Sequence, residues 1–160
     1  MAECVILIGL PGAGKTTFYR ERFSTTHQHI SKDLWPKAAN LERRLRQELE
    51  HAFSAGRSVV VDNLNVSAAE RASSIAIARA HGAHVVGYFF DLSTRAAVAR
   101  NAQRNGRERV PNVAIFAAAK RQNVPSFDEG FDALFRVTLT PTHGATVDAI
   151  PRPAGRDEKT

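Results

Sequence analysis

Hydrophobic residues along this chain follow two alternating patterns. Short apolar runs, several of them rich in β-branched residues, favour strands at 3–8, 27–31, 57–62, 84–90 and 134–139. Apolar residues at helical spacing favour helices from about 15 to 23, from Pro36 to Gly56, from Ser67 to Gly82, from Ser93 to Asn105 and from Pro111 to Arg121. Because strand and helix alternate throughout, we expect one three-layer α/β domain over residues 1–140, with a mostly parallel central sheet.

The remaining residues, 141–160, hold three prolines and two glycines and predict a flexible C-terminal tail. No apolar stretch approaches the ~18 residues that a membrane span needs, and no signal peptide is recognisable, so we expect a soluble cytoplasmic protein. The single cysteine, Cys4, lies in the first apolar run, where a buried inert thiol is expected. No clustered ligands suggest a zinc site.

Charge favours an anionic partner. The chain has 22 Lys and Arg against 16 Asp and Glu, a net charge of +6, which suits nucleotides or nucleic acid. The alternative is a basic protein that binds no polymer. Five arginines fall within fifteen residues, namely Arg95, Arg100, Arg104, Arg107 and Arg109.

The segment from Gly9 to Thr16, GLPGAGKT, matches the phosphate-binding P-loop pattern between a strand and a helix. Its glycines let backbone N–H groups converge on phosphate oxygens, Lys15 offsets β- and γ-phosphate charge, and the Thr16 hydroxyl suits Mg²⁺. The predicted nucleotide contacts are Gly9, Pro11, Gly12, Ala13, Gly14, Lys15, Thr16 and Thr17. No N-K-x-D sequence for guanine is present, and the chain is too short for a transporter ATPase, so a small phosphotransferase using ATP and Mg²⁺ is expected.

Two carboxylates follow predicted strands, whose carboxyl ends gather beside the ligand crevice in such a sheet. Asp33 comes after the weak second strand, where a carboxylate can act as the base for an attacking hydroxyl. Asp62 ends the 57–62 run, where it would face Mg²⁺ or the acceptor. For each, the alternative is a turn or helix-cap residue.

Arg100 and Arg104 are spaced four residues apart, so a continuous helix would place them on one face. Near Gly106 that helix is predicted to act as a lid whose arginines stabilise the transferred phosphoryl group. A solvated charged face is the alternative interpretation.

Several motifs in order resemble the kinase domain of polynucleotide 5′-hydroxyl kinases, over roughly residues 4–139. They are GLPGAGKTTF at 9–18, SKD at 31–33, VDNLN at 61–65, Arg100-Asn101 with Arg104, Val110-Pro111, and PSFDEGF at 125–131. The chain departs from the family pattern at Lys32, where arginine is usual, and at Leu64, where threonine is usual. A basic residue one helical turn after the base is replaced by Pro36.

The resemblance implies a P-loop fold of the small-kinase type, with Asp33 as general base, Arg104 as the lid arginine, Arg100 as a companion nucleotide contact and Asp62 near metal and acceptor. No D-x-D-G-T phosphatase motif is present, so we expect the kinase alone. The predicted reaction moves the γ-phosphate of ATP to a 5′-hydroxyl end of DNA or RNA. The alternatives are a small-molecule, sugar or toxin-like kinase, and a non-catalytic nucleotide-binding module. Candidates for a nucleic-acid groove are Lys32, Lys37, Arg43, Arg44 and Arg46.

Overall fold

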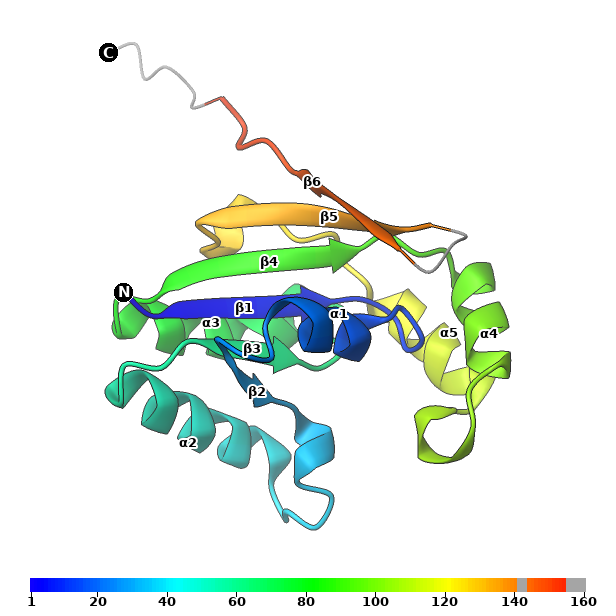
Figure 1. The fold of residues 1–160 in the computed structure, drawn as a ribbon, viewed down its shortest axis with the longest axis horizontal. Helices are drawn as coiled ribbons and strands as arrows, with labels where there is room; N and C mark the ends of the chain where they lie inside the picture. Colours follow the sequence, from blue (N-terminus) through cyan, green and yellow to red (C-terminus); the bar gives the residue numbers. More distant parts are fainter. Residues whose placement is uncertain (141–143, 155–160) are drawn as a thin grey trace.

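The computed structural model describes residues 1–140 and 144–154, and its centre is a six-stranded sheet (Figure 1). The strands in chain order are β1 Glu3–Ile8, β2 Gln28–Ile30, β3 Val59–Asp62, β4 His84–Phe90, β5 Ala133–Leu139 and β6 Ala145–Ala149. Their order across the sheet is β2-β3-β1-β4-β5-β6. The first five strands are parallel, and β6 pairs antiparallel with β5.

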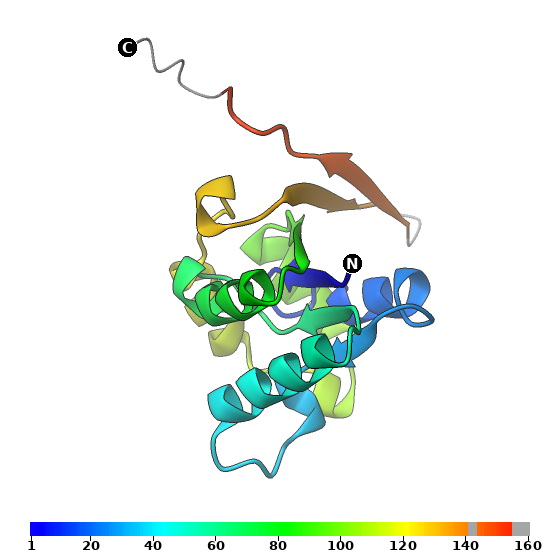
Figure 2. The same cartoon turned by 90° about the vertical axis from the view of Figure 1, so that its left-hand side faces the viewer.

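Helices cover both faces of the sheet, which confirms the predicted three-layer α/β fold. The α-helices are α1 Lys15–Arg22, α2 Leu41–Ser54, α3 Ala68–Ala80, α4 Thr94–Ala102 and α5 Asn112–Arg121. Short 3₁₀ helices are η1 Lys32–Leu34, η2 Gly106–Glu108 and η3 Phe127–Glu129. Figure 2 shows α1 on one side of the sheet and α2 and α3 on the other. Among the described residues, no helix is both long and apolar enough to cross a bilayer.

The side chains of β1 explain why its sequence is apolar without alternation. Cys4, Ile6 and Ile8 pack in the core under α2 and α3, whereas Val5 and Leu7 pack with Phe18 of α1 on the opposite face. A strand buried on both faces has no position for a polar side chain. Burial, with a smaller contribution from Glu3, raises the pKa of the Cys4 thiol to about 12, so this thiol is unreactive at neutral pH.

Strand register brings the chemically interesting loops to one edge of the sheet. Leu7 of β1 lies opposite Asp62 of β3, and Ile30 of β2 lies opposite Val61. Because the strands are parallel, the segments that follow β1, β2 and β3 all begin at this edge. The helices α4 and α5 lie beyond the same edge (Figure 1), where they share a third apolar cluster with Leu10.

Two helix boundaries differ from the prediction. Helix α2 begins at Leu41 rather than Pro36, because turns occupy the segment after η1 and the Asn40 side chain accepts from the Arg43 N–H as the cap. Helix α4 ends at Ala102 rather than Asn105.

The tail expectation is corrected for 145–149, which form β6. Val147 of β6 packs on the core face that carries α1, and its pairing with Val137 adds it to the sheet. Two β-branched residues, Thr146 and Val147, in a short segment between prolines gave too weak a pattern to predict this strand. The other parts of the predicted tail at 141–143 and 155–160 lie outside the described residues.

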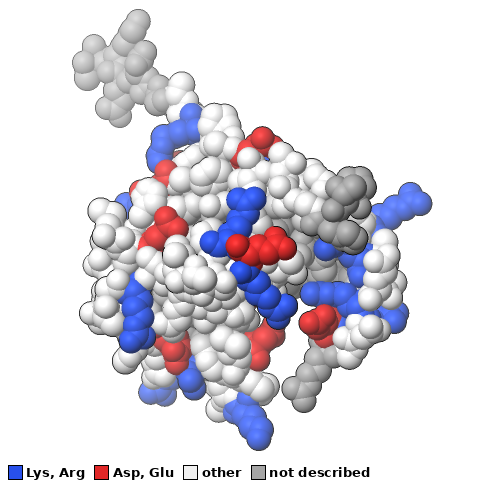
Figure 3. Space-filling model, viewed as in Figure 1, with Lys and Arg blue, Asp and Glu red and all other residues white. Residues whose placement is uncertain are grey.

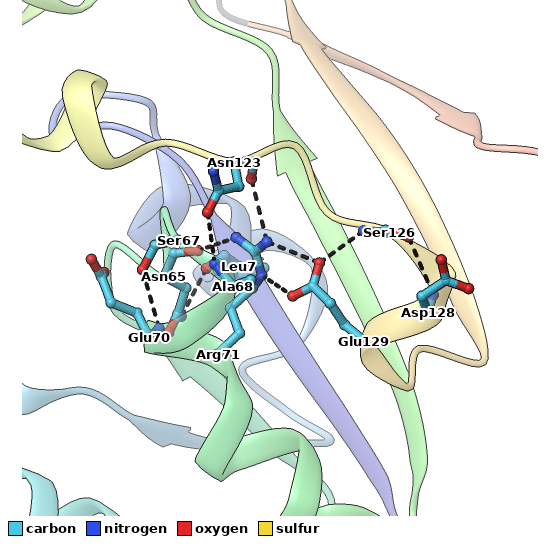
Figure 4. A network of polar contacts seen from close by, with 10 residues as sticks. All are labelled: Leu7, Asn65, Ser67, Ala68, Glu70, Arg71, Asn123, Ser126, Asp128 and Glu129. Atoms are coloured by element: carbon cyan, nitrogen blue, oxygen red, sulfur yellow. Dashed lines mark hydrogen bonds and ion pairs between the residues drawn. The ribbon is translucent and has the colours of Figure 1, made fainter.

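A buried arginine holds the loop that follows β3 (Figure 4). The side chain of Arg71, on α3, is fully buried, and its guanidinium pairs with both carboxylate oxygens of Glu129 at 2.7 and 3.0 Å. It also donates to the carbonyl oxygens of Asn65 at 2.7 Å and Asn123 at 3.3 Å. The Asn65 side chain in turn donates to the Leu7 carbonyl at 3.0 Å. The network therefore ties α3, β1 and η3 to one loop.

We expect Glu129→Ala to destabilise the protein by about 3–5 kcal/mol, because it leaves the buried guanidinium without its counter-charge. The control is Glu70→Ala, which breaks the exposed Arg121–Glu70 pair and should cost about 0–1 kcal/mol. Urea unfolding measures both free energies. Equal losses for the two variants would contradict a special role for the buried pair.

Candidate active site

The loop from Gly9 to Gly14 has the backbone shape that a phosphate cradle needs. Gly12 and Gly14 have φ of 84° and 88°, in the left-handed region that favours glycine. At Gly9 a Cβ atom would lie 3.0 Å from the Phe90 Cβ, so the close approach to β4 also favours glycine. Pro11 and Ala13 are buried. Helix α1 starts directly at Lys15, which directs its N-terminal N–H groups toward the loop.

Lys15 is held inside this loop by the loop's own carbonyl groups. Its Nζ donates to the Gly9 oxygen at 2.7 Å and to the Leu10 oxygen at 3.0 Å. Burial lowers the pKa of Lys15 to about 8 against the opposing effect of Asp62, while Arg104 lowers this pKa further and Asp33 raises it. The charges of Asp33, Asp62 and Arg104 therefore all act on this ammonium group.

The Thr16 hydroxyl donates to Asp62 Oδ2 at 2.8 Å, which joins the start of α1 to the end of β3. Asp62 is buried, and the same Oδ2 atom lies 2.8 Å from His29 Nε2. A hydroxyl that sends its proton to a carboxylate presents its lone pairs to a cation. Thr17, the predicted further phosphate contact, is exposed in the first turn of α1.

Asp33 lies in the middle of η1 and is exposed. The cap of η1 is Ser31, whose hydroxyl accepts from the Asp33 N–H at 3.3 Å, and α2 has its own cap at Asn40. The alternative interpretation of Asp33 as a helix cap is therefore wrong. The Asn63 side chain accepts from the Lys32 N–H at 2.9 Å, so η1 is fixed to the loop after β3.

Helix α4 packs directly against the phosphate-binding loop. Arg100 Nε donates to the Gly12 carbonyl at 2.7 Å, and a Cβ on Gly12 would lie 3.3 Å from the Ala97 oxygen. The buried Asn101 side chain exchanges two hydrogen bonds with the Val110 backbone, at 2.7 and 3.0 Å, which closes the loop between α4 and α5. In this structure Arg100 thus holds the phosphate-binding loop by donating a hydrogen bond to the Gly12 carbonyl of that loop.

Arg104 does not share a helix face with Arg100. Helix α4 stops at Ala102, and the Arg104 N–H donates to the Asn101 oxygen in the turn that follows. The spacing of four residues carried no information here because the helix ends between the two arginines. Arg104 is nevertheless near enough to influence the pKa of Lys15.

Sequence reasoning missed several residues of this arrangement. His29 gave no signal inside a weak strand, and its partner Asp62 is 33 residues away in sequence. Arg71 was not singled out either, because its partner Glu129 is 58 residues away in sequence. Asn65 and Glu129 belong to motifs of the family pattern, but their role in holding the loop required the contacts shown in Figure 4.

The surface on the side shown in Figure 3 is mixed in charge, with Lys and Arg interspersed with Asp and Glu. Two of the five groove candidates are paired. Lys32 Nζ lies 2.9 Å from Glu42 Oε1, and Arg44 pairs with Glu48 at 2.8 Å. The Arg44 guanidinium carbon also lies over the Trp35 ring, 5.2 Å from its centroid. Lys37, Arg43 and Arg46 are exposed.

Known proteins resemble this chain in sequence and in fold. A protein of Acanthamoeba polyphaga mimivirus named as a bifunctional polynucleotide phosphatase/kinase is 27% identical over 144 residues. The alignment covers 86% of this chain but 33% of the viral protein, so the chain spans about a third of that relative. This similarity confirms the resemblance to polynucleotide kinases that the motifs predicted.

Solved structures of two kinases share the fold. A sugar kinase of Janibacter sp. HTCC2649 has a TM-score of 0.65 at 14% identity, over 86% of each chain. A fungal RNA kinase has a TM-score of 0.66 at 19% identity, over 88% of this chain and 39% of its own. The family model described as an AAA domain, AAA_33, matches residues 4–124, which hold the phosphate-binding loop, Asp33, Asp62 and Arg104. The chain therefore belongs to the AAA_33 family of P-loop AAA domains.

Proposed function

We propose that this protein is an ATP-dependent kinase that transfers the γ-phosphate to the 5′-hydroxyl end of DNA or RNA. The observation that carries the proposal is the phosphate-binding loop with Lys15 held inside it and with the Thr16 hydroxyl donating to Asp62. Asp33 and Arg104 are near enough to influence the pKa of Lys15. A regulatory module needs the loop but has no use for a base and a further cation beside it. The similarity to the viral polynucleotide phosphatase/kinase supports the acceptor.

In the proposed reaction the acceptor oxygen forms a bond to the γ-phosphorus and ADP departs with the electron pair of the broken P–O bond. Asp33 takes the hydroxyl proton, a role its exposed carboxylate permits. Lys15 and Arg104 offset the charge on the phosphates and on the transferred group. Asp33 is thus the catalytic base and Arg104 the electrostatic stabiliser.

The residues at the loop fit a Mg²⁺ ion that is shared with the nucleotide. The Thr16 hydroxyl already donates to Asp62, so its lone pairs suit a hard cation. Within 1–140 and 144–154 there is no group of three or more His, Cys, Asp or Glu that could hold a metal, so phosphate oxygens and water would complete the coordination. When bound, Mg²⁺ neutralises charge on the β- and γ-phosphates.

A small-molecule kinase is the second candidate. It is favoured by the mixed charge of the surface in Figure 3 and by the ion pairs that occupy Lys32 and Arg44. The Janibacter sugar kinase shares the fold over most of both chains, which is compatible with either acceptor.

The lowered pKa of Lys15 predicts proton uptake on nucleotide binding. At about pH 9 an amine with a pKa of about 8 is mostly neutral, and the nearby triphosphate charge should raise its pKa and protonate it. At about pH 6.5 the amine is charged before and after binding, so uptake should vanish. Calorimetry in buffers of different ionisation enthalpy measures the protons. Lys15→Met should lose both the uptake and the transfer activity. Proton uptake that does not change with pH would contradict the assignment of Lys15 as the group that is protonated when nucleotide binds.

Asp33→Asn should lower kcat by about 10²–10⁴-fold and leave ATP affinity nearly unchanged, because the amide keeps the shape but cannot take a proton. Asp128→Asn is a matched control. Asp128 is also an exposed residue in the middle of a 3₁₀ helix, with its N–H bonded to the hydroxyl of a serine two residues earlier. Steady-state kinetics compare the two. A fall in kcat of less than about tenfold for Asp33→Asn would show that Asp33 is not the catalytic base.

If the acceptor is a nucleic-acid end, its KM should rise steeply with salt because binding releases counterions, while the KM for ATP should respond less. Lys37→Ala should flatten the logarithmic slope by about one unit for each backbone phosphate that the side chain neutralises in the wild type. Arg57→Ala removes an equal charge before β3, at the opposite end of the sheet, and should leave the slope unchanged. A salt-independent KM, or equal use of a nucleoside and a long oligonucleotide, would favour the small-molecule kinase.

A further inference from the structure

One oxygen of Asp62 joins two side chains from different elements. Asp62 Oδ2 accepts from the Thr16 hydroxyl at 2.8 Å and lies 2.8 Å from His29 Nε2. A carboxylate only accepts hydrogen bonds, so the His29 contact requires a proton on Nε2. Among the described residues, both hydrogen bonds to this carboxylate reach the same oxygen. The Asp62 side chain is 5% exposed, so water contributes little to fixing it.

The imidazole itself is held by an aromatic neighbour. The rings of His29 and Tyr19 are stacked, with centroids 4.2 Å apart and planes inclined by 14°. The Tyr19 hydroxyl donates to the His27 carbonyl at 3.1 Å, which links α1 to the segment just before His29. Since Tyr19 lies one helical turn after Thr16, α1 fixes both the hydroxyl donor and the ring of the second donor.

We propose that His29 is a positioning residue that fixes the Asp62 carboxylate for the metal–nucleotide complex. This inference rests on the proposed function, because it assigns His29 to the Mg²⁺ side of the same site. A Thr16 oxygen that binds a cation must direct its proton to an acceptor, and that acceptor is Asp62 Oδ2. A carboxylate free to rotate would lose this geometry. The second hydrogen bond to Oδ2, from a ring clamped by Tyr19, prevents the rotation.

The hydrogen bond from His29 also has a second effect on the metal affinity, and this effect has the opposite sign. A hydrogen bond from His29 also withdraws negative charge from Asp62, which by itself would weaken attraction for a cation. If that effect dominated, removal of the imidazole would strengthen metal binding. If positioning dominates, removal weakens it. The direction of the change in metal affinity therefore separates the two.

Two substitutions at His29 isolate the hydrogen bond. His29→Phe keeps a ring that can stack on Tyr19 but has no nitrogen, whereas His29→Gln keeps an N–H donor near the position of Nε2. His27→Phe is the matched control. His27 is two residues earlier, and its Nε2 lies 2.9 Å from another carboxylate, that of Glu3, at the opposite end of β1 from the phosphate-binding loop.

Electron paramagnetic resonance can measure the affinity of Mn²⁺ for the 160-residue chain when it is saturated with a non-hydrolysable ATP analogue. We expect His29→Phe to weaken Mn²⁺ binding by about tenfold, the size of a missing hydrogen bond to a charged group. His29→Gln and His27→Phe should stay within about twofold of the wild type. Nucleotide affinity in excess EDTA should be unchanged for all three, which a general loss of structure would not allow.

Unchanged or tighter Mn²⁺ binding by His29→Phe would overturn the positioning role, and so would equal losses for His29→Phe and His29→Gln. Because no acceptor is present, these results do not depend on which hydroxyl the enzyme phosphorylates. A wild-type protein that bound no Mn²⁺–nucleotide complex would instead overturn the proposed kinase site itself, together with this inference.

Discussion

The ion pair between the buried Arg71 and the partly buried Glu129 holds the loop on which the candidate site depends. A buried guanidinium is costly unless it is paired and hydrogen-bonded, and here the carboxylate and two backbone oxygens together accept from all three of its nitrogens. The loop after β3 is thereby fixed beside β1, where the Leu64 carbonyl accepts from the Gly9 N–H at 3.0 Å. The first glycine of the phosphate-binding loop and the residues that follow Asp62 are thus positioned by one polar network that lies behind the site.

The positive charge of Lys15 in the loop is compensated only in part. Burial lowers its pKa most and Arg104 adds to this, while Asp62 and Asp33 oppose the shift, so on balance its ammonium form is less stable than in water. Two carbonyl groups of the loop accept from it, and a third carbonyl accepts from Arg100. A bound triphosphate would relieve the repulsion and take over these donors. The positive groups and hydrogen-bond donors of the loop are therefore already arranged to favour the binding of an anion such as a nucleotide.

In the proposed function, the choice of acceptor is made in a different part of the molecule. The fold is shared with a sugar kinase and with an RNA kinase, so the fold does not distinguish between these acceptors. The segment from η1 to the start of α2 carries Asp33, an ion pair between Lys32 and Glu42, and Trp35 with the Arg44 guanidinium over its ring. Its turns replace the expected first part of a helix, which leaves Lys37 exposed four residues after Asp33. In the proposed function this segment meets the acceptor.

The sequence by itself determined the alternation of strands and helices, because apolar periodicity reflects burial on one or two faces. It also determined the phosphate-binding loop, because glycine, lysine and threonine stand at fixed local spacing. It also indicated Asp33 and Asp62 as residues at strand ends, since parallel strands direct their carboxyl ends to one edge. Only the tertiary structure decided what these residues contact. The bond of His29 to Asp62, the pairing of Arg71 with Glu129 and the addition of β6 to the sheet join residues that are distant in sequence or weak in pattern. The separation of Arg104 from the α4 face depended on where the helix ends, which is set by packing and hydrogen bonding around Asn101.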